Sequence, residues 1–186
     1  MSFMLLGILN SQAAGGGGAA YDLLESETLT SSASSITFSS LSAYATDYKH
    51  LQIRAVMQDT SANTGLESIG VQFNGDTSSV YSRHTLKGNG SSVASDNTTS
   101  FGSILIVDAS GRESNVFGAS VIDILDFSAS KNTTIRALTG GNGSTSGGVN
   151  LTSGGYFNTA AVTSTTLIAR GTAFAIGSRF SLIGVK

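Results

Sequence analysis

Hydrophobic residues in this chain occur in short runs that alternate with polar residues, and clusters of Gly, Ser and Asn separate the runs. In the clearest run, Lys49–Gln58, the apolar residues Leu51, Ile53, Ala55 and Met57 occupy every second position, as in a strand with one buried face. The same pattern predicts further strands at Tyr21–Thr28, Ser34–Phe38, Ser68–Phe73, Tyr81–Leu86, Ser103–Asp108, Ala119–Phe127, Thr133–Leu138, Val149–Ser153, Val162–Ile168 and Arg179–Val185.

These short strands, without any helical periodicity, predict an all-β protein folded as a β-sandwich. A jelly roll fits the pattern first and an immunoglobulin-like sandwich second, since the Cys and Trp markers of immunoglobulin domains do not occur. Ala119–Phe127 is apolar on both faces, which predicts a central strand. The Asn74-Gly75 pair predicts a tight hairpin. Gly88–Ser100 and Gly140–Gly148 are predicted to be long polar loops.

The chain divides into two parts, an N-terminal arm at residues 1–20 and a β-sandwich domain at residues 21–186. The arm contains an apolar stretch followed by the linker Gly15–Gly18, which should be flexible. Two placements are open: the arm adds a strand to its own domain, or it inserts into a neighbouring subunit, which we favour. No positive charge precedes the apolar stretch, so we expect it to stay in the mature protein. The residues expected to contact the partner are Phe3, Leu5, Leu6, Ile8 and Leu9.

Composition narrows the function classes. Only 12% of the residues are charged and the net charge is -2, so nothing predicts binding to nucleic acid or to an anionic membrane. No apolar run has the roughly 20 residues of a membrane-spanning helix. The chain contains no Cys, which excludes disulfides and thiolate zinc sites. A surface of Ser and Thr is poor at keeping free monomers apart, which favours a protein covered by partners.

Candidate catalytic or metal-binding residues are few. His50 and His84 are the two histidines, and two such ligands without Cys make a poor metal site. Asp123 and Asp126, three apart in one predicted strand, would point to opposite faces and so would not form an acid–base pair. No Gly-x-Ser-x-Gly motif occurs. We therefore predict no catalytic residues, no metal, no cofactor and no enzymatic activity.

Several stretches of packing and turn residues are shared with a known group of proteins. They are Met1–Phe3 with Leu6–Gly18, Tyr21–Glu25, Tyr48–Arg54, Phe73–Asp76 and Gly177–Val185. In these stretches the chain resembles small virion structural proteins of tailed bacteriophages, notably marine, cyanophage-like ones. The resemblance implies a location in the virion and partners among capsid or tail subunits. Family analogy also implies a homo-oligomer, for which we expect a trimer.

The expected function is that of a capsid decoration or cement protein, anchored by its N-terminal arm. The alternative is a tail component: a fibre tip, a baseplate piece or a carbohydrate-binding receptor protein. For that alternative, Tyr81, Tyr156 and Phe157 are the aromatic rings nearest the predicted polar loops, and they are the candidates for glycan contact. An enzyme such as a depolymerase ranks third.

Overall fold

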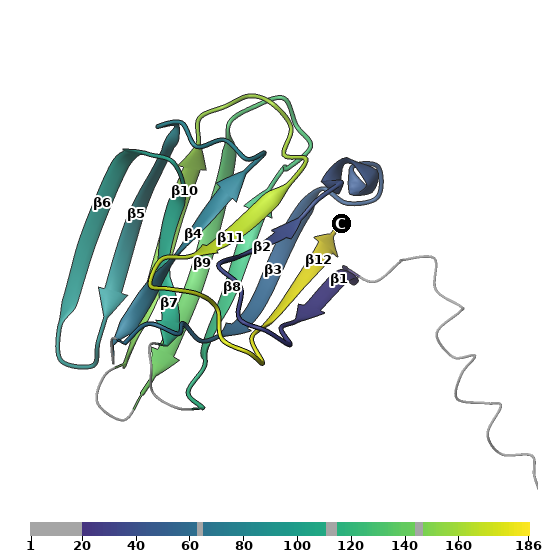
Figure 1. Ribbon diagram of the computed structural model, residues 1–186. Helices are drawn as coiled ribbons and strands as arrows, with labels where there is room; N and C mark the ends of the chain where they lie inside the picture. Colours follow the sequence, from purple (N-terminus) through teal and green to yellow (C-terminus); the bar gives the residue numbers. More distant parts are fainter. Residues whose placement is uncertain (1–19, 63–64, 111–114, 144–146) are drawn as a thin grey trace, which may run out of the picture.

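The computed structural model describes residues 20–62, 65–110, 115–143 and 147–186. Within them the chain forms twelve strands and a single 3-10 turn, η1, at Leu41–Tyr44, so the all-β prediction is confirmed (Figure 1). The strands are β1 Tyr21–Thr28, β2 Ser35–Phe38, β3 His50–Met57, β4 Leu66–Phe73, β5 Tyr81–Gly88, β6 Val93–Phe101, β7 Ile104–Ser110, β8 Gly118–Leu125, β9 Thr133–Asn142, β10 Gly147–Tyr156, β11 Thr165–Ala169 and β12 Arg179–Val185.

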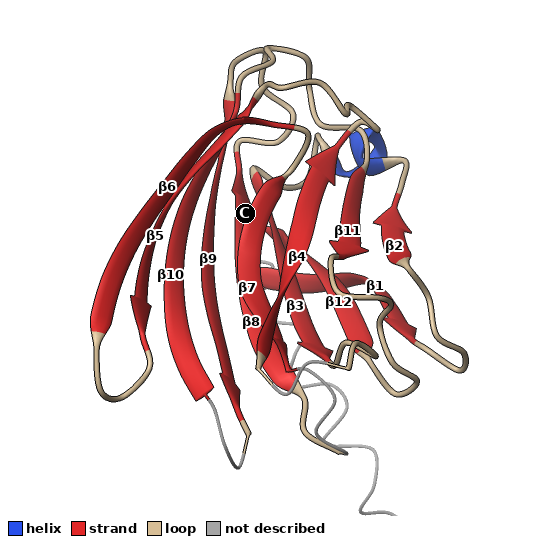
Figure 2. Ribbon diagram, turned by 60° about the vertical axis from the view of Figure 1, so that its left-hand side comes forward, coloured by secondary structure: helices blue, strands red, loops and turns tan. Residues whose placement is uncertain are grey.

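The strands form two antiparallel sheets that make a sandwich. The larger sheet has eight strands in the order β1-β12-β3-β8-β9-β10-β5-β6, and the smaller has four in the order β2-β11-β4-β7. The smaller sheet lies against one face of the larger one, while β6 forms a far edge of the molecule (Figures 1 and 2). The larger sheet therefore has an inner face, toward the smaller sheet, and an outer face that the smaller sheet does not cover.

Alternate residues of both sheets build the core. In β3, Leu51, Ile53, Ala55 and Met57 are all buried, as the sequence pattern predicts. β8 lies between β3 and β9, so its prediction as a central strand is confirmed. Other large side chains that are fully buried include Phe73, Phe127, Phe174, Phe180, Leu41, Ile69 and Ile104. Because burial of this much apolar surface is the main driving force for folding, the two facing layers account for the stability of the sandwich.

Strand β6 was not expected from the sequence. The predicted polar loop Gly88–Ser100 is wrong, since Val93–Phe101 pairs with β5 along its length and the turn is only Asn89–Ser92. Likewise β9 and β10 extend into the predicted loop Gly140–Gly148. Strand prediction relies on apolar residues on a buried face, and β6 is an edge strand in which six of the nine residues are small and polar.

The Asn74-Gly75 turn forms, but it does not make a hairpin. Asn74 and Gly75 have φ values of 54° and 65°, and the Asp76 amide donates to the Phe73 carbonyl at 2.9 Å, as in a tight turn of the predicted type. The turn instead carries the chain from β4 in the smaller sheet to β5 in the larger one. The amide of Thr163 donates to Asn74 Oδ1 at 2.7 Å, which ties this corner to the segment before β11.

The first described residue, Ala20, lies beside the last residue of the chain. Its carbonyl oxygen accepts a hydrogen bond from the Lys186 amide at 3.4 Å. β1 and β12 are neighbours in the larger sheet, so both ends of the domain lie near one of its edges. The predicted arm contacts Phe3, Leu5, Leu6, Ile8 and Leu9 lie outside the described residues.

Candidate functional site

The outer face of the larger sheet carries a group of exposed aliphatic side chains. Their exposed fractions lie between 37% and 59%, which is unusual for side chains of this size in the middle of a sheet. They come from five adjacent strands, β5, β10, β9, β8 and β3. We call them the outer apolar patch, which consists of Leu86, Leu151, Leu138, Val121, Val149 and Val56.

Strand register places four of these residues in one row. Leu86 pairs with Leu151, Leu151 with Leu138, and Leu138 with Val121. Neighbouring strands are about 4.8 Å apart, so each of these side chains is next to the following one, and the row extends about 14 Å across four strands. The row forms a continuous aliphatic ridge on the outer face.

A second row, two residues further along the strands, has smaller side chains in the middle. There Val149 pairs with Gly140, Gly140 with Ala119, and Ala119 with Val56. Beside the ridge lies a hollow of ≈ 330 Å³ lined by Ala119, Val121, Leu138, Gly140 and Val149. A Cβ on Gly140 would meet no atom closer than 3.5 Å, so the space above it is open. The outer face thus combines a ridge with an adjacent groove.

Polar side chains border the patch. Gln52 Nε2 donates to Asp123 Oδ1 at 2.7 Å, and Arg54 Nε donates to Gln52 Oε1 at 2.8 Å. Asp123 also lies directly opposite Arg136 in the register of β8 and β9. The Arg54 guanidinium is 5.7 Å from the centre of the Tyr21 ring. The outer face therefore has an apolar centre and a rim of hydrogen-bonded polar groups.

The outer face of the smaller sheet differs in character. Its outward side chains include Ser35, Thr37, Gln72 and Thr166, and the hydroxyls of Thr37 and Thr166 are hydrogen bonded at 2.9 Å. Among the strand residues whose side chains are described, the strongly exposed large hydrophobic ones all belong to the larger sheet. The apolar exposure is thus a property of one face of the sandwich.

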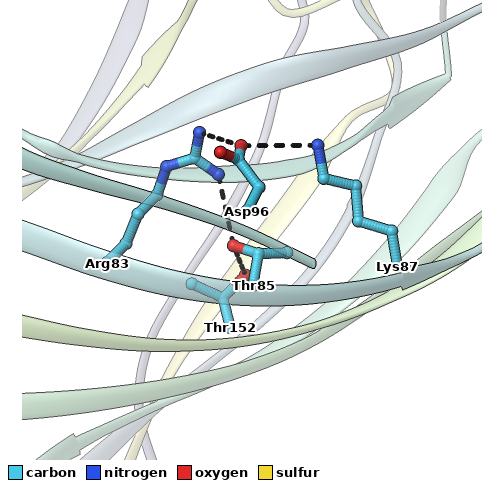
Figure 3. Close-up of polar contacts among 5 residues, drawn as sticks. All are labelled: Arg83, Thr85, Lys87, Asp96 and Thr152. Carbon is cyan, nitrogen blue, oxygen red and sulfur yellow. Dashed lines mark hydrogen bonds and ion pairs between the residues drawn. The ribbon is translucent and has the colours of Figure 1, made fainter. Parts of the chain in front are cut away.

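On the inner face of β5 and β6 a polar cluster holds the sheet edge in place (Figure 3). Arg83 Nη2 lies 2.9 Å from Asp96 Oδ2, and Lys87 Nζ lies 3.4 Å from the same oxygen. Arg83 Nη1 also donates to Thr85 Oγ1, which is hydrogen bonded to the Thr152 hydroxyl. The charge of Arg83, with that of Lys87, holds the pKa of Asp96 below its usual range. These side chains point away from the patch, because Thr85 and Thr152 alternate with its leucines along the strands.

The histidines and the predicted carboxylate pair lie apart. His50 is on β3 and His84 on β5, with β8, β9 and β10 between them. His50 Nδ1 accepts the amide of Asp126 at 2.9 Å. Asp126 lies beyond the end of β8 at a φ of 51°, so the prediction that it shares a strand with Asp123 is wrong. In the described part of the chain, no three His, Asp or Glu side chains form a group suited to a metal ion.

Of the three aromatic residues predicted to contact a glycan, two are in the core. Tyr81 and Tyr156 do lie together, with ring centres 4.9 Å apart and rings stacked, but each is only 1% exposed. The Tyr81 hydroxyl donates to the Asp76 carbonyl, and the Tyr156 hydroxyl donates to Asp76 Oδ2 at 3.0 Å. As placed, neither ring offers a face to a sugar. Phe157 is 57% exposed, so the glycan expectation depends on this one ring.

No protein family, curated protein sequence or solved structure matches this chain in the comparisons. Among the described residues, no helix is of a length and hydrophobicity that would let it cross a bilayer.

The outer apolar patch could not be predicted from the sequence. One signal was present, since Ala119–Phe127 was recognised as apolar on both faces. Leu86, Leu138 and Leu151 also stand out of phase with the buried residues of their strands. Only the register between strands shows that these residues form one row.

Proposed function

We propose that this chain is a non-enzymatic structural protein of a bacteriophage particle, with capsid decoration as its role. The observation that carries the proposal is the outer apolar patch. A contiguous apolar face bordered by polar residues is typical of a surface that another protein covers. The site favours assembly with other proteins, since its centre has aliphatic side chains and few polar groups to orient a small substrate.

The strand order supports a jelly roll, an architecture found among viral capsid domains. Without the hairpins β5–β6 and β9–β10, the remaining eight strands have the orders β1-β12-β3-β8 and β2-β11-β4-β7. Counted in chain order, the first of these strands pairs with the eighth, the second with the seventh, the third with the sixth and the fourth with the fifth. A jelly roll has this pairing, because it can be described as one long antiparallel hairpin that is wrapped around a sandwich. The two extra hairpins widen the sheet that bears the patch.

The phage assignment draws on the resemblance described above. Three of the resembling stretches, Tyr21–Glu25, Tyr48–Arg54 and Gly177–Val185, fall on or next to β1, β3 and β12. These strands are adjacent in the larger sheet and lie where the N-terminal arm joins the domain. In the proposed role, the arm anchors the domain to the capsid through Phe3, Leu5, Leu6, Ile8 and Leu9.

The test is co-sedimentation of the full-length protein with purified capsids and, separately, with purified tails of the phage that encodes it. The double variant Leu6→Asp/Ile8→Asp places charges in the apolar part of the arm and should abolish capsid binding. The double variant Asn10→Asp/Ser11→Asp adds the same charge in the polar part of the arm and should still bind. Binding to tails alone would replace decoration with a tail role, and binding to neither particle would refute the proposed function.

A further inference from the structure

We propose that the outer apolar patch is the contact surface between two copies of this chain, which meet face to face through their eight-stranded sheets. The pairing adds a self-contact to the proposed function. It rests on that function in one respect, namely that the dimer is part of a phage particle. Four observations carry the inference: the size of the outer face, its relief, the distribution of its polar groups, and the small size of the apolar stretch Phe3–Leu9.

The size of the face suits a stable dimer. Eight strands spaced about 4.8 Å apart, each about eight residues long at about 3.3 Å per residue, give a face of about 34 by 26 Å. Its area of about 900 Å² is close to the roughly 800 Å² that each partner buries in an interface of standard size. Two such faces packed about 10 Å apart would extend the sandwich by one more layer.

The relief of the face is complementary to itself. The ridge of Leu86, Leu151, Leu138 and Val121 runs beside the groove over Gly140 and Ala119, which lies on β9 and β8, two of the four strands that the ridge crosses. A two-fold axis between ridge and groove places the ridge of each copy over the groove of the other. In such an isologous contact both copies use the same residues, as in the commonest class of soluble oligomer.

The polar groups of the face lie where an interface tolerates them. Asp123 and Arg54 are both hydrogen bonded to Gln52 at the border of the patch, so pairing does not bury them without partners. The centre consists of aliphatic side chains and glycine, which lose only contact with water. An apolar centre with a polar rim is the usual anatomy of a protein interface.

The apolar stretch of the N-terminal arm is too small to cover the face. Its apolar stretch, Phe3–Leu9, has seven residues and an extended length of about 23 Å. At the width of about one to two strands it would cover roughly 100 to 200 Å², a quarter of the face or less. A second copy covers the whole face, and we therefore assign the patch to it.

The test is the mass of the full-length protein in solution, measured by sedimentation equilibrium and light scattering over a dilution series. We expect a reversible dimer, in place of the trimer that family analogy implies. Leu138→Lys should weaken it by roughly 100-fold or more, because the ammonium group would be buried without a partner. Leu138 is 55% exposed in the single chain, so this substitution leaves the core intact. Ser35→Lys puts the same charge on the outer face of the smaller sheet and should leave the dimer unchanged.

A second variant tests the groove itself. Gly140→Leu fills the hollow from within, and the nearest atoms to its Cβ are the Gly148 oxygen at 3.5 Å and Val149 Cγ2 at 3.9 Å. Since these are ordinary contacts, the variant should keep the wild-type urea midpoint at dilutions where both proteins are monomeric. Its dimer should dissociate at least roughly tenfold more readily, by loss of shape fit.

The outcomes that would overturn the pairing differ from the one that would refute only the proposed function. A monomer at every concentration, a trimer, or a dimer that Leu138→Lys does not weaken would each place the contact elsewhere. If the wild type is monomeric and Leu6→Asp/Ile8→Asp makes it dimerise, the arm covers the patch in place of a second copy. A dimer that forms as expected but does not bind capsids or tails would refute the proposed function and leave the pairing intact.

Discussion

Tyr81→Phe tests whether the buried tyrosine hydroxyl supports the corner where the chain crosses between the sheets. The Tyr81 hydroxyl accepts the Phe73 amide at 3.1 Å and donates to the Asp76 carbonyl at 3.0 Å, so it bridges the two sides of the Asn74-Gly75 turn. Burial raises the pKa of Tyr81, which keeps this hydroxyl protonated. The substitution preserves the ring and removes only the oxygen.

The size of the effect follows from the two groups that lose their partner. A buried polar group left without a hydrogen bond costs about 1 kcal/mol or more, so Tyr81→Phe should lower the free energy of unfolding by about 2 kcal/mol. With a urea m-value of about 2 kcal/mol/M for a domain of this size, the midpoint of unfolding should fall by about 1 M.

The assay is urea unfolding followed by far-UV circular dichroism, with the m-value compared between proteins. Tyr21→Phe is the matched control, because the Tyr21 side chain is 53% exposed, and its midpoint should stay within about 0.2 M of the wild type. A Tyr81→Phe midpoint equally close to the wild type would show that the hydroxyl does not support this corner. If Tyr81→Phe lost glycan binding without losing stability, Tyr81 would be a glycan-binding residue, as predicted from the sequence.

Three further predictions concern the same domain. Asn74→Ala should cost about 2 kcal/mol, because it removes the side-chain bonds to the segment before β11 and puts Ala at a φ of 54°. Gly184→Ala should cost about 1 to 3 kcal/mol, since its Cβ would lie 2.5 Å from the Tyr48 ring. The pKa of Asp96 is lowered in the folded state, chiefly by Arg83, so this carboxylate stabilises the fold above its unfolded pKa and loses that contribution as acid protonates it. Stability should therefore fall as the pH drops below about 4, and less so in Asp96→Asn.

Each of these has its own control. For Asn74, the variant Asn74→Gly keeps the turn conformation and loses only the side-chain bonds, so it should cost less than Asn74→Ala. For Gly184, the control is Gly140→Ala, which should not change the urea midpoint. For Asp96, urea midpoints across the pH series should be compared in low and high salt, since screening weakens exposed pairs. An identical pH profile in wild type and Asp96→Asn would contradict the assignment.

Sequence reasoning succeeded where a strand has one buried and one solvated face, as in Lys49–Gln58. It missed β6 because that strand lies at the sheet edge, where neither face must be apolar, so Val93–Phe101 has no alternating apolar pattern. At Asn74-Gly75 the local backbone conformation was predictable from the residue pair. Whether the two flanking strands pair is decided by contacts far apart in the sequence, and there the hairpin prediction failed.

The outer apolar patch also depends on contacts between residues far apart in the sequence, so it could not be predicted. Leu86, Val121, Leu138 and Leu151 are separated by up to 65 positions in the chain, and only pairing between β5, β10, β9 and β8 brings them into one row. The buried positions of Tyr81 and Tyr156 likewise depend on the facing sheet. The sequence shows which residues are apolar or aromatic, but the strand order and register determine which of these side chains are exposed next to one another.

The pairing of β1 with β12 has a kinetic consequence during synthesis. β1 is made long before its partner in the sheet, Arg179–Val185. β3 also pairs with β12, so two early strands keep an open edge until Arg179–Val185 has left the ribosome. Such long-range pairing slows folding and exposes unpaired edges to aggregation. A nascent chain stalled before residue 179 should therefore need a chaperone, and the emergence of Arg179–Val185 should complete the sheet.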